Sequence, residues 1–167
     1  MKNAYLSACV SALALVAATT TLAQDVPATE DNATIAEVAP TSSEEWGVFS
    51  SNDRTLYLID LKGFSPIGDA TTVRVARVPT QGATTLFVHR IDEYELRCRA
   101  NQARLVTEVE LDDNGDEIER YPEADAEWED VRPTSLPAHF KAIACDNARP
   151  SGATADSIKA FISRGRQ

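Results

Sequence analysis

The residues with the best-defined chemistry in this chain are two cysteines, Cys98 and Cys145, and two histidines, His89 and His139. The sequence contains neither a His-Glu-x-x-His nor a Cys-x-x-Cys motif, so the ligand spacing of a zinc site is missing and we predict no metal. Each histidine is expected to be a packed or surface residue. The third cysteine, Cys9, lies in an N-terminal segment that we expect to be removed, so two cysteines remain. An even number of cysteines in an exported protein indicates a disulfide, and pairing Cys98 with Cys145 leaves no thiolate for nucleophilic catalysis.

The acidic residues suggest two weaker sites. Residues 110–115 place oxygen donors before a glycine, as a calcium loop does, but the loop does not open with Asp, and Tyr121 stands where the closing Glu is needed. The Asn-Gly pair at 114–115 is better explained by a hairpin turn. Glu127 and Glu129 could perform acid–base catalysis, but in a chain with 26 acidic residues a solvated face is the simpler interpretation. We therefore predict no enzymatic activity and no cofactor.

The first residues of the chain indicate export. Lys2 precedes an apolar run at residues 6–18 that is too short to span a bilayer, and a Thr-Leu-Ala sequence then supplies the small residues of a cleavage site. We predict a signal peptide at residues 1–23, with the cut at its end or a residue or two away. Cys9 closes a lipoprotein-like box, but most of the apolar run follows it, so we assign Cys9 to the removed peptide. No second apolar span follows, and we expect no integral membrane protein.

The charge and composition of the chain limit the classes of partner and the cellular locations that we expect for it. A net charge of −10 at pH 7 argues against nucleic acid and against an anionic membrane surface, because both require a basic face. Residues 24–45 consist mainly of Ala, Thr, Glu, Asp, Ser and Pro, and we predict a disordered acidic linker there, with a short helix at 34–39 as the alternative. The exported chain is expected in the periplasm or at the cell surface.

From Trp46 onward, most strand-like runs alternate apolar and polar residues with a period of two, which is typical of half-buried strands. Residues 55–61 are apolar on both faces, which suggests a central strand. The inward parity switches at residues 91–92, where we expect a bulge or tight bend, and residues 62–70 are expected to form a loop. We predict an antiparallel sheet of about six strands. The pattern marks residues 46–50, 55–61, 71–78, 84–90, 93–99 and 103–111, a returning strand from 118, and a short strand at 127–131.

The strand at residues 93–99 is expected to be central to the fold. Its alternation places Tyr94, Leu96 and Cys98 on the inner face. The opposite side carries two acidic and two basic residues and is the candidate binding face: Glu93, Glu95, Arg97 and Arg99. Charge pairs with neighbouring strands are the alternative explanation for these four residues.

Two helices are expected after the sheet. Thr134 or Ser135 can cap the first, and apolar residues then recur at helical spacing at Leu136, Phe140 and Ile143. A shorter second helix is expected within a C-terminal tail at residues 151–167. The first helix ends near Cys145, so a disulfide to Cys98 would join it to the sheet. Because the enclosed loop is long, that disulfide would stabilise the fold by about 4 kcal/mol.

Several short motifs occur in a fixed order along the predicted sheet and first helix. They are Trp46, Tyr94–Cys98, Asp113–Gly115, Trp128, Arg132–Ser135 and Cys145. In this order they resemble the bacterial surface-adhesin protein E family, over roughly Trp46 to Cys145 within a domain that we predict at residues 46–150. The resemblance implies an antiparallel sheet with a helix packed on it and a strand-to-helix disulfide. It also implies adhesion, because the founding member is a surface lipoprotein that binds host matrix and serum proteins. This chain lacks a credible lipid-acceptor cysteine, in which it departs from that member.

The sequence therefore predicts an exported α+β domain with a non-catalytic, adhesin-like binding function. Its expected partner is an extracellular or envelope protein or another envelope component, and a homodimer through a sheet edge is a further prediction. The alternative is a periplasmic module that binds a small ligand or assists envelope assembly. Trp46 and Trp128 are predicted to be core residues near the ends of the sheet, with ligand stacking as the alternative.

Overall fold

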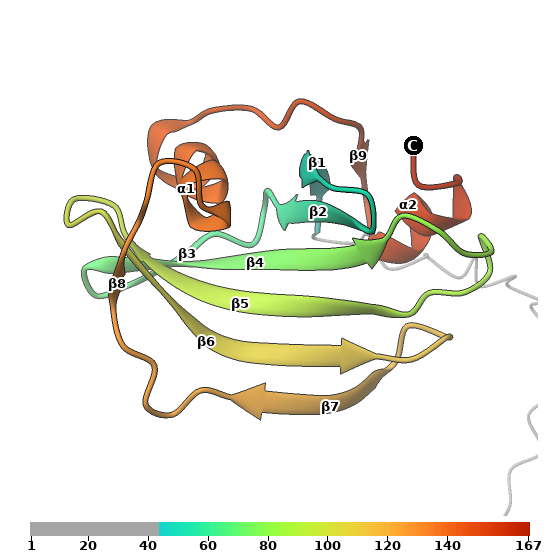
Figure 1. Ribbon diagram of the computed structural model, residues 1–167, viewed down its shortest axis with the longest axis horizontal. Helices are drawn as coiled ribbons and strands as arrows, with labels where there is room; N and C mark the ends of the chain where they lie inside the picture. Colours follow the sequence, from blue (N-terminus) through green and yellow to red (C-terminus); the bar gives the residue numbers. More distant parts are fainter. Residues whose placement is uncertain (1–43) are drawn as a thin grey trace, which may run out of the picture. The chain divides into compact units, whose positions relative to one another are not determined.

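The computed structural model describes residues 44–167, so the predicted signal peptide and most of the predicted linker lie outside the described residues. The described part consists of an antiparallel sheet and two helices, α1 (Leu136–Asp146) and α2 (Ile158–Ser163) (Figure 1). The strands are β1 (Trp46–Ser51), β2 (Thr55–Asp60), β3 (Ser65–Ile67), β4 (Ala70–Pro79), β5 (His89–Arg97), β6 (Gln102–Leu111), β7 (Glu117–Pro122), β8 (Glu129–Asp130) and β9 (Thr154–Ala155). No helix in this part of the chain is long and apolar enough to cross a membrane.

The sheet has nine strands, not about six. Its order is β7-β6-β5-β4-β2-β1-β9, with β3 paired to β4 and β8 paired to β6. Two short strands were not predicted: β3, of three residues, lies within residues 62–70, where a loop was expected, and β9, of two residues, lies in the predicted tail. The two-residue β8 falls inside the strand predicted at residues 127–131. Such short pairings show no period-two pattern of their own, because they form only where a neighbouring strand brings a backbone edge within reach.

The predicted strand at residues 84–90 is wrong over most of its length, because residues 84–88 form a turn and loop, and its last two residues belong to the same strand as the one predicted at 93–99. A single strand, β5, runs from His89 to Arg97 and pairs with β4 without interruption. The register shift lies between Glu93 and Tyr94, against β6 rather than at the predicted bend. The change in which alternate residues face inward has another cause. The two ends of β5 bury side chains on opposite faces of the sheet.

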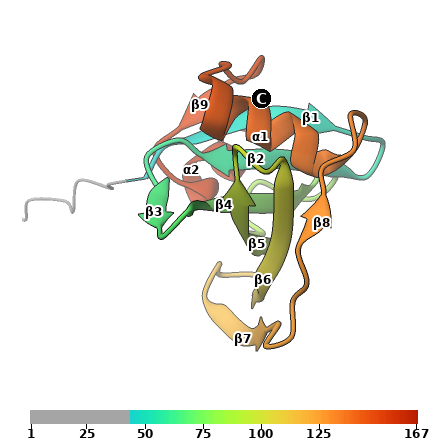
Figure 2. The same ribbon diagram turned by 90° about the vertical axis from the view of Figure 1, so that its left-hand side faces the viewer.

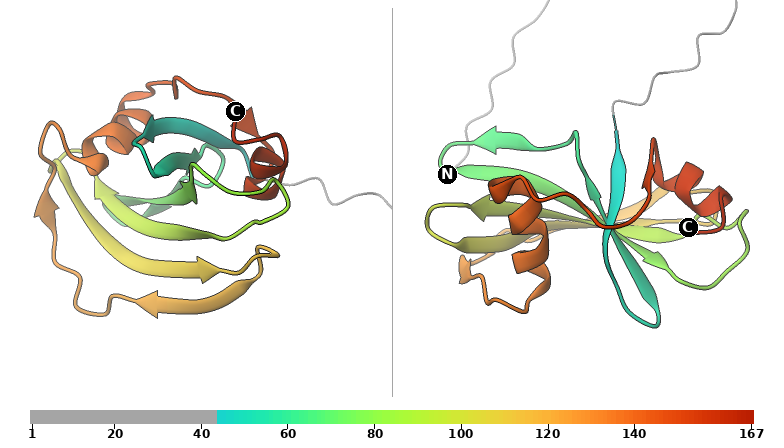
Figure 3. Two further views of the ribbon diagram at one scale, coloured as in Figure 1. Left: turned by 45° about the vertical axis from the view of Figure 1, so that its right-hand side comes forward. Right: turned by 90° about the horizontal axis from the view of Figure 1, so that it is seen from above.

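Two apolar clusters occupy these opposite faces. Leu58 of β2 packs in the cluster that includes the buried residues of α2, whereas its neighbour Ile59 packs in the cluster that includes the buried residues of α1. Since successive residues of a strand point to opposite faces, the two helices cover different faces of the sheet. Figures 1 and 3 show α1 toward one end of the strands and α2 toward the other. The sheet is therefore covered on each face over only part of its length.

The predicted first helix and its disulfide are confirmed. Ser135 occupies the N-cap position of α1, but its hydroxyl makes no capping hydrogen bond and donates to the carbonyl of Arg132 at 2.8 Å instead. Phe140 and Ile143 are the buried residues of the helix, and Asn147 ends it with a φ of 58°. Cys98, in the turn after β5, is bonded to Cys145 near the end of α1, with a Cα–Cα distance of 5.7 Å. The ring of Phe140 lies 4.8 Å from that of Tyr94, which ties the helix to the centre of the sheet.

Residues 151–167, assigned to a tail in the sequence analysis, are part of the folded core. β9 pairs with β1, and Phe161 and Ile162 of α2 are completely buried. The guanidinium of Arg166 donates hydrogen bonds of 3.0 Å to the carbonyls of Pro79 and Gly82, which closes this end of the chain against the loop after β4.

Candidate binding surface

Three of the four residues of the predicted binding face, Glu93, Glu95 and Arg97, lie on the same side of β5, and each has a charged partner. The distances between charged atoms are 3.2 Å for Glu93–Arg120, 2.7 Å for Glu95–Arg104 and 3.1 Å for Arg97–Asp69. Arg99 lies beyond the end of β5 in the exposed turn. The structure thus shows the charge pairs that were the alternative explanation for this face.

Trp128 lies against the same charged face. Its ring contacts two guanidinium groups, with Arg97 Cζ 4.0 Å and Arg104 Cζ 4.6 Å from the ring centroid. The side chain is half-buried and belongs to neither apolar cluster, whereas Trp46 is fully buried, as expected for a core residue. Trp128 therefore holds the segment between β7 and β8 against the sheet through cation–π contacts.

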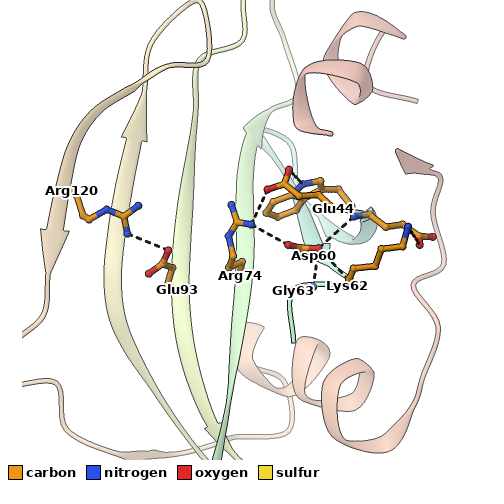
Figure 4. Close-up of polar contacts among 9 residues, drawn as sticks. Glu44, Asp60, Lys62, Gly63, Arg74, Glu93 and Arg120 are labelled. Carbon is orange, nitrogen blue, oxygen red and sulfur yellow. Dashed lines mark hydrogen bonds and ion pairs between the residues drawn. The ribbon is translucent and has the colours of Figure 1, made fainter. Parts of the chain in front are cut away.

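A second polar group on this face is structural (Figure 4). Asp60, at the end of β2, is 1% exposed and accepts hydrogen bonds from the backbone of Lys62 and Gly63 and from Arg74 Nη1 at 3.1 Å. A Cβ at Gly63 would lie 2.3 Å from Asp60 Oδ2, so only glycine fits this turn. Arg74 also bonds Glu44 Oε1 at 2.9 Å. Partial burial opposes ionisation of Glu44, but hydrogen bonds from Trp46 and Arg74 outweigh it and lower the pKa of that carboxyl.

The opposite face of β5 carries a buried carboxyl. Asp92 is 3% exposed and lies 2.8 Å from Arg77 Nη2, which also lies 2.8 Å from Glu108. Burial raises the pKa of Asp92 to about 6, although Arg77 works in the opposite direction, and burial raises the pKa of the neighbouring Tyr94 to about 12. The ionised form of Asp92 is therefore less stable in the folded protein than in the unfolded chain.

This burial makes stability depend on pH. The folded state binds more protons than the unfolded state between about pH 4 and pH 6, so the contribution of Asp92 to the free energy of unfolding falls as the pH rises through this window. We compare the free energy of unfolding of Asp92→Asn with that of wild type. We expect the difference to shift in favour of the variant by about 2 kcal/mol when the pH is raised from 4 to 7.5. Urea unfolding at both pH values measures this difference, and an equal gap between the two proteins at both would contradict it.

A cavity of about 600 Å³ lies beside β6, between the part of β6 that pairs with β7 and the part that pairs with β8. β7 pairs with residues 107–111 of β6, and β8 pairs with Gln102 and Ala103. Between them, Arg104 and Leu105 have no strand partner on this side within the described residues, and the segment joining β7 to β8 passes beside β6 (Figure 2). The cavity lies under this segment and reaches the start of α1.

The cavity has an apolar wall and an acidic rim. Tyr94 and Leu105, which face each other across β5 and β6, form the wall with Val131 and Pro137. The rim carries four acidic residues of the segment that ends in β8: Glu123, Glu127, Glu129 and Asp130. A volume of this size with mixed lining is typical of ligand pockets in proteins. Two of these acids, Glu127 and Glu129, stand out in the sequence, but the pocket does not, because its wall comes from residues far apart in the chain.

The two histidines of the chain lie in different surroundings. His89 is 5% exposed, its Nδ1 lies 2.5 Å from the carbonyl oxygen of Phe87, and burial lowers its pKa. It lines a second, smaller cavity of about 370 Å³ with Glu110 and three arginines, two of which have carboxylate partners. His139 is exposed on α1. Within residues 44–167, no group of three or more His, Cys, Asp or Glu residues is placed to hold a metal ion.

Comparisons of the chain with protein-family models, with curated proteins and with solved structures found no match. The resemblance to surface-adhesin protein E therefore stays a prediction, and a functional proposal rests on the geometry of the described residues.

Proposed function

We propose that this chain is an exported, non-catalytic binding domain, adhesin-like in its role, which recognises an extended segment of another protein at the β7 margin of the sheet. The observation that carries this proposal is the open edge: β7 is the last strand in the sheet order, and all six of its residues are exposed. An exposed edge strand offers backbone donors and acceptors to an added strand. Ile118, which is 63% exposed, and Tyr121, which is 39% exposed, add apolar surface beside that edge.

The charges on β7 disfavour a second copy of the chain as the added strand. In a symmetric antiparallel pair the two-fold axis is perpendicular to the sheet and passes midway between one residue and its copy, so these two residues lie directly opposite each other. The two registers that pair most of β7 place Glu119 against its own copy or Arg120 against its own copy. Like charges directly opposite are destabilising, and this pattern favours a different protein over the homodimer of the sequence analysis.

Site-specific photo-crosslinking in the cells that produce the chain tests this proposal. A benzophenone amino acid at Ile118 or Tyr121 is expected to give a covalent adduct with another protein. The same group at Arg149, which is exposed in the loop between α1 and β9, serves as the control. Equal adducts at all three positions, or adducts only with a second copy of the chain, would overturn the proposal.

Accessibility separates the adhesin-like role from a periplasmic one. An adhesin must be reachable from outside, so protease is expected to cleave the domain on intact cells. Cleavage only after the outer membrane is permeabilised would remove the adhesin-like role. The cavity of about 600 Å³ would then favour the second candidate, a periplasmic module that binds a small ligand or assists envelope assembly.

A further inference from the structure

We infer that the cavity between β7 and β8 receives a basic side chain, lysine or arginine, of the segment that pairs with β7. This inference rests on the proposed function and specifies its partner. The segment joining β7 to β8 starts at Glu123, directly after β7, and this residue already lines the cavity. A strand that continues along the edge past Pro122 therefore reaches the cavity mouth, where, among the described residues, Arg104 and Leu105 have no strand partner on the side of β6 away from β5.

The acidic residues at the cavity differ from those on the neighbouring strands. On β5 and β6 the outward acids have arginine partners: Glu93 with Arg120, Glu95 with Arg104, and both Glu108 and Glu110 with Arg90. Within the described residues, Glu123, Glu127 and Glu129 form no ion pair, and Asp130 accepts only a 3.3 Å hydrogen bond from Gln102. The rim thus presents carboxylates whose charge the fold itself does not balance.

Two arginines at the cavity do not cancel this charge. The guanidinium of Arg104 donates to Glu95 at 2.7 and 2.9 Å and lies against the ring of Trp128, so it is already engaged. Arg132 is exposed at the rim. With four acids against these two residues, the cavity remains a negative site.

The shape of the cavity suits a long basic side chain. Lysine and arginine bury an aliphatic stem and keep the charged head near water. Here the stem would lie against Leu105, Val131 and the ring of Tyr94, and the head would reach Glu127 and Glu129 at the exposed rim.

Other occupants fit the same site less well. Residues 24–43 of this chain contain no lysine or arginine, so the chain's own N-terminal region has no basic side chain near β1 to offer. A second copy carries a net charge of −10 and meets like charges on β7. A free alkyl amine has the right head group but makes no backbone contacts with the edge.

A peptide titration followed by NMR of the ¹⁵N-labelled protein tests the inference. The probe is acetyl-Thr-Val-Lys-Val-Thr-amide, with counterparts in which arginine, norleucine or glutamate replaces the lysine. The lysine and arginine peptides are expected to shift the amide signals of Leu105 and Val131 and to bind at least fivefold more tightly than the norleucine peptide. Norleucine keeps the stem and removes only the charge, so this ratio isolates the head group.

Variants assign the preference to the rim. In E127Q/E129Q the lysine-to-norleucine ratio is expected to fall to within about twofold, because exposed ion pairs each contribute up to about fivefold. The control D53N/D113N changes the net charge equally with two exposed residues at the other end of the strands and should keep the wild-type ratio. An equal ratio in wild type and E127Q/E129Q, or no preference for lysine in wild type, would overturn the inference.

Two further outcomes separate this inference from the proposed function. If n-butylamine binds as tightly as the lysine peptide, the cavity is a small-amine site and the inference about a peptide side chain is wrong. If crosslinks form at Ile118 while the lysine peptide shows no preference over norleucine, edge binding stands and the basic specificity fails. Weaker binding in 500 mM salt is expected for the lysine and arginine peptides but not for the norleucine peptide, because exposed charges are screened.

Discussion

Cys98→Ser and Cys145→Ser are each expected to lower the free energy of unfolding by about 4 kcal/mol. The two cysteines are 47 residues apart in the sequence, and in the chain-entropy model a cross-link that closes a loop of this length removes about that much unfolded-state entropy. The bond also joins the turn after β5 to the end of α1, which buries only Phe140 and Ile143 of its own residues. Denaturant unfolding under oxidising conditions measures the loss.

Reduction supplies the control for this prediction. Dithiothreitol should bring the wild type to the stability of the single variants and leave those variants unchanged, since they have no bond to lose. The double variant should be no less stable than either single one. Equal stability of wild type and variants before reduction would show that the disulfide contributes nothing measurable.

Phe161→Ala is expected to destabilise the protein by about 3 to 5 kcal/mol, the usual cost of removing a buried phenylalanine ring. Phe161 is completely buried, and its cluster includes Trp46 and Leu58 from strands near the other end of the chain. The cluster covers one face of the sheet at the α2 end, so a cavity there weakens the contact between the last helix and the first two strands. Thermal or urea unfolding reports the effect.

Ser163→Ala is the matched control, because Ser163 is exposed at the end of the same helix. It should change the free energy of unfolding by less than about 0.5 kcal/mol, as surface substitutions usually do. A loss below 1 kcal/mol for Phe161→Ala would mean that α2 is a peripheral tail, as the sequence analysis assumed, and not part of the core.

Local chemistry explains the features that the sequence predicted well. The Asn-Gly turn forms between β6 and β7, where Gly115 has a φ of 75° and the side chain of Asp112 accepts backbone hydrogen bonds from Asn114 and Asp116. Apolar patterning predicted β1, β2, β4 and β6 closely, and the helical spacing after Thr134 or Ser135 predicted α1. These features depend on neighbours within a few residues, which a sequence shows directly.

The candidate site was only partly predictable. The face formed by Glu93, Glu95 and Arg97 follows from alternation, but their partners, such as Arg120, come from other strands and depend on register. The cavity needs Tyr94 of β5 and Pro137 of α1 in one place, and no local signal reports that. Its acidic rim could be found in the sequence only as an excess of acids after β7.

The sequence by itself determined that this chain forms an antiparallel sheet, a capped helix and a disulfide, because period, capping and cysteine number are local or compositional properties. Only the tertiary structure decided that α1 and α2 cover opposite faces and that residues 151–167 complete the core. It also decided that, within residues 44–167, Arg104 and Leu105 of β6 have no strand partner on the side away from β5. Those outcomes depend on sheet order and strand register, which are set by packing between residues far apart in the chain. The same packing creates the cavity on which the inferred preference for a basic side chain depends.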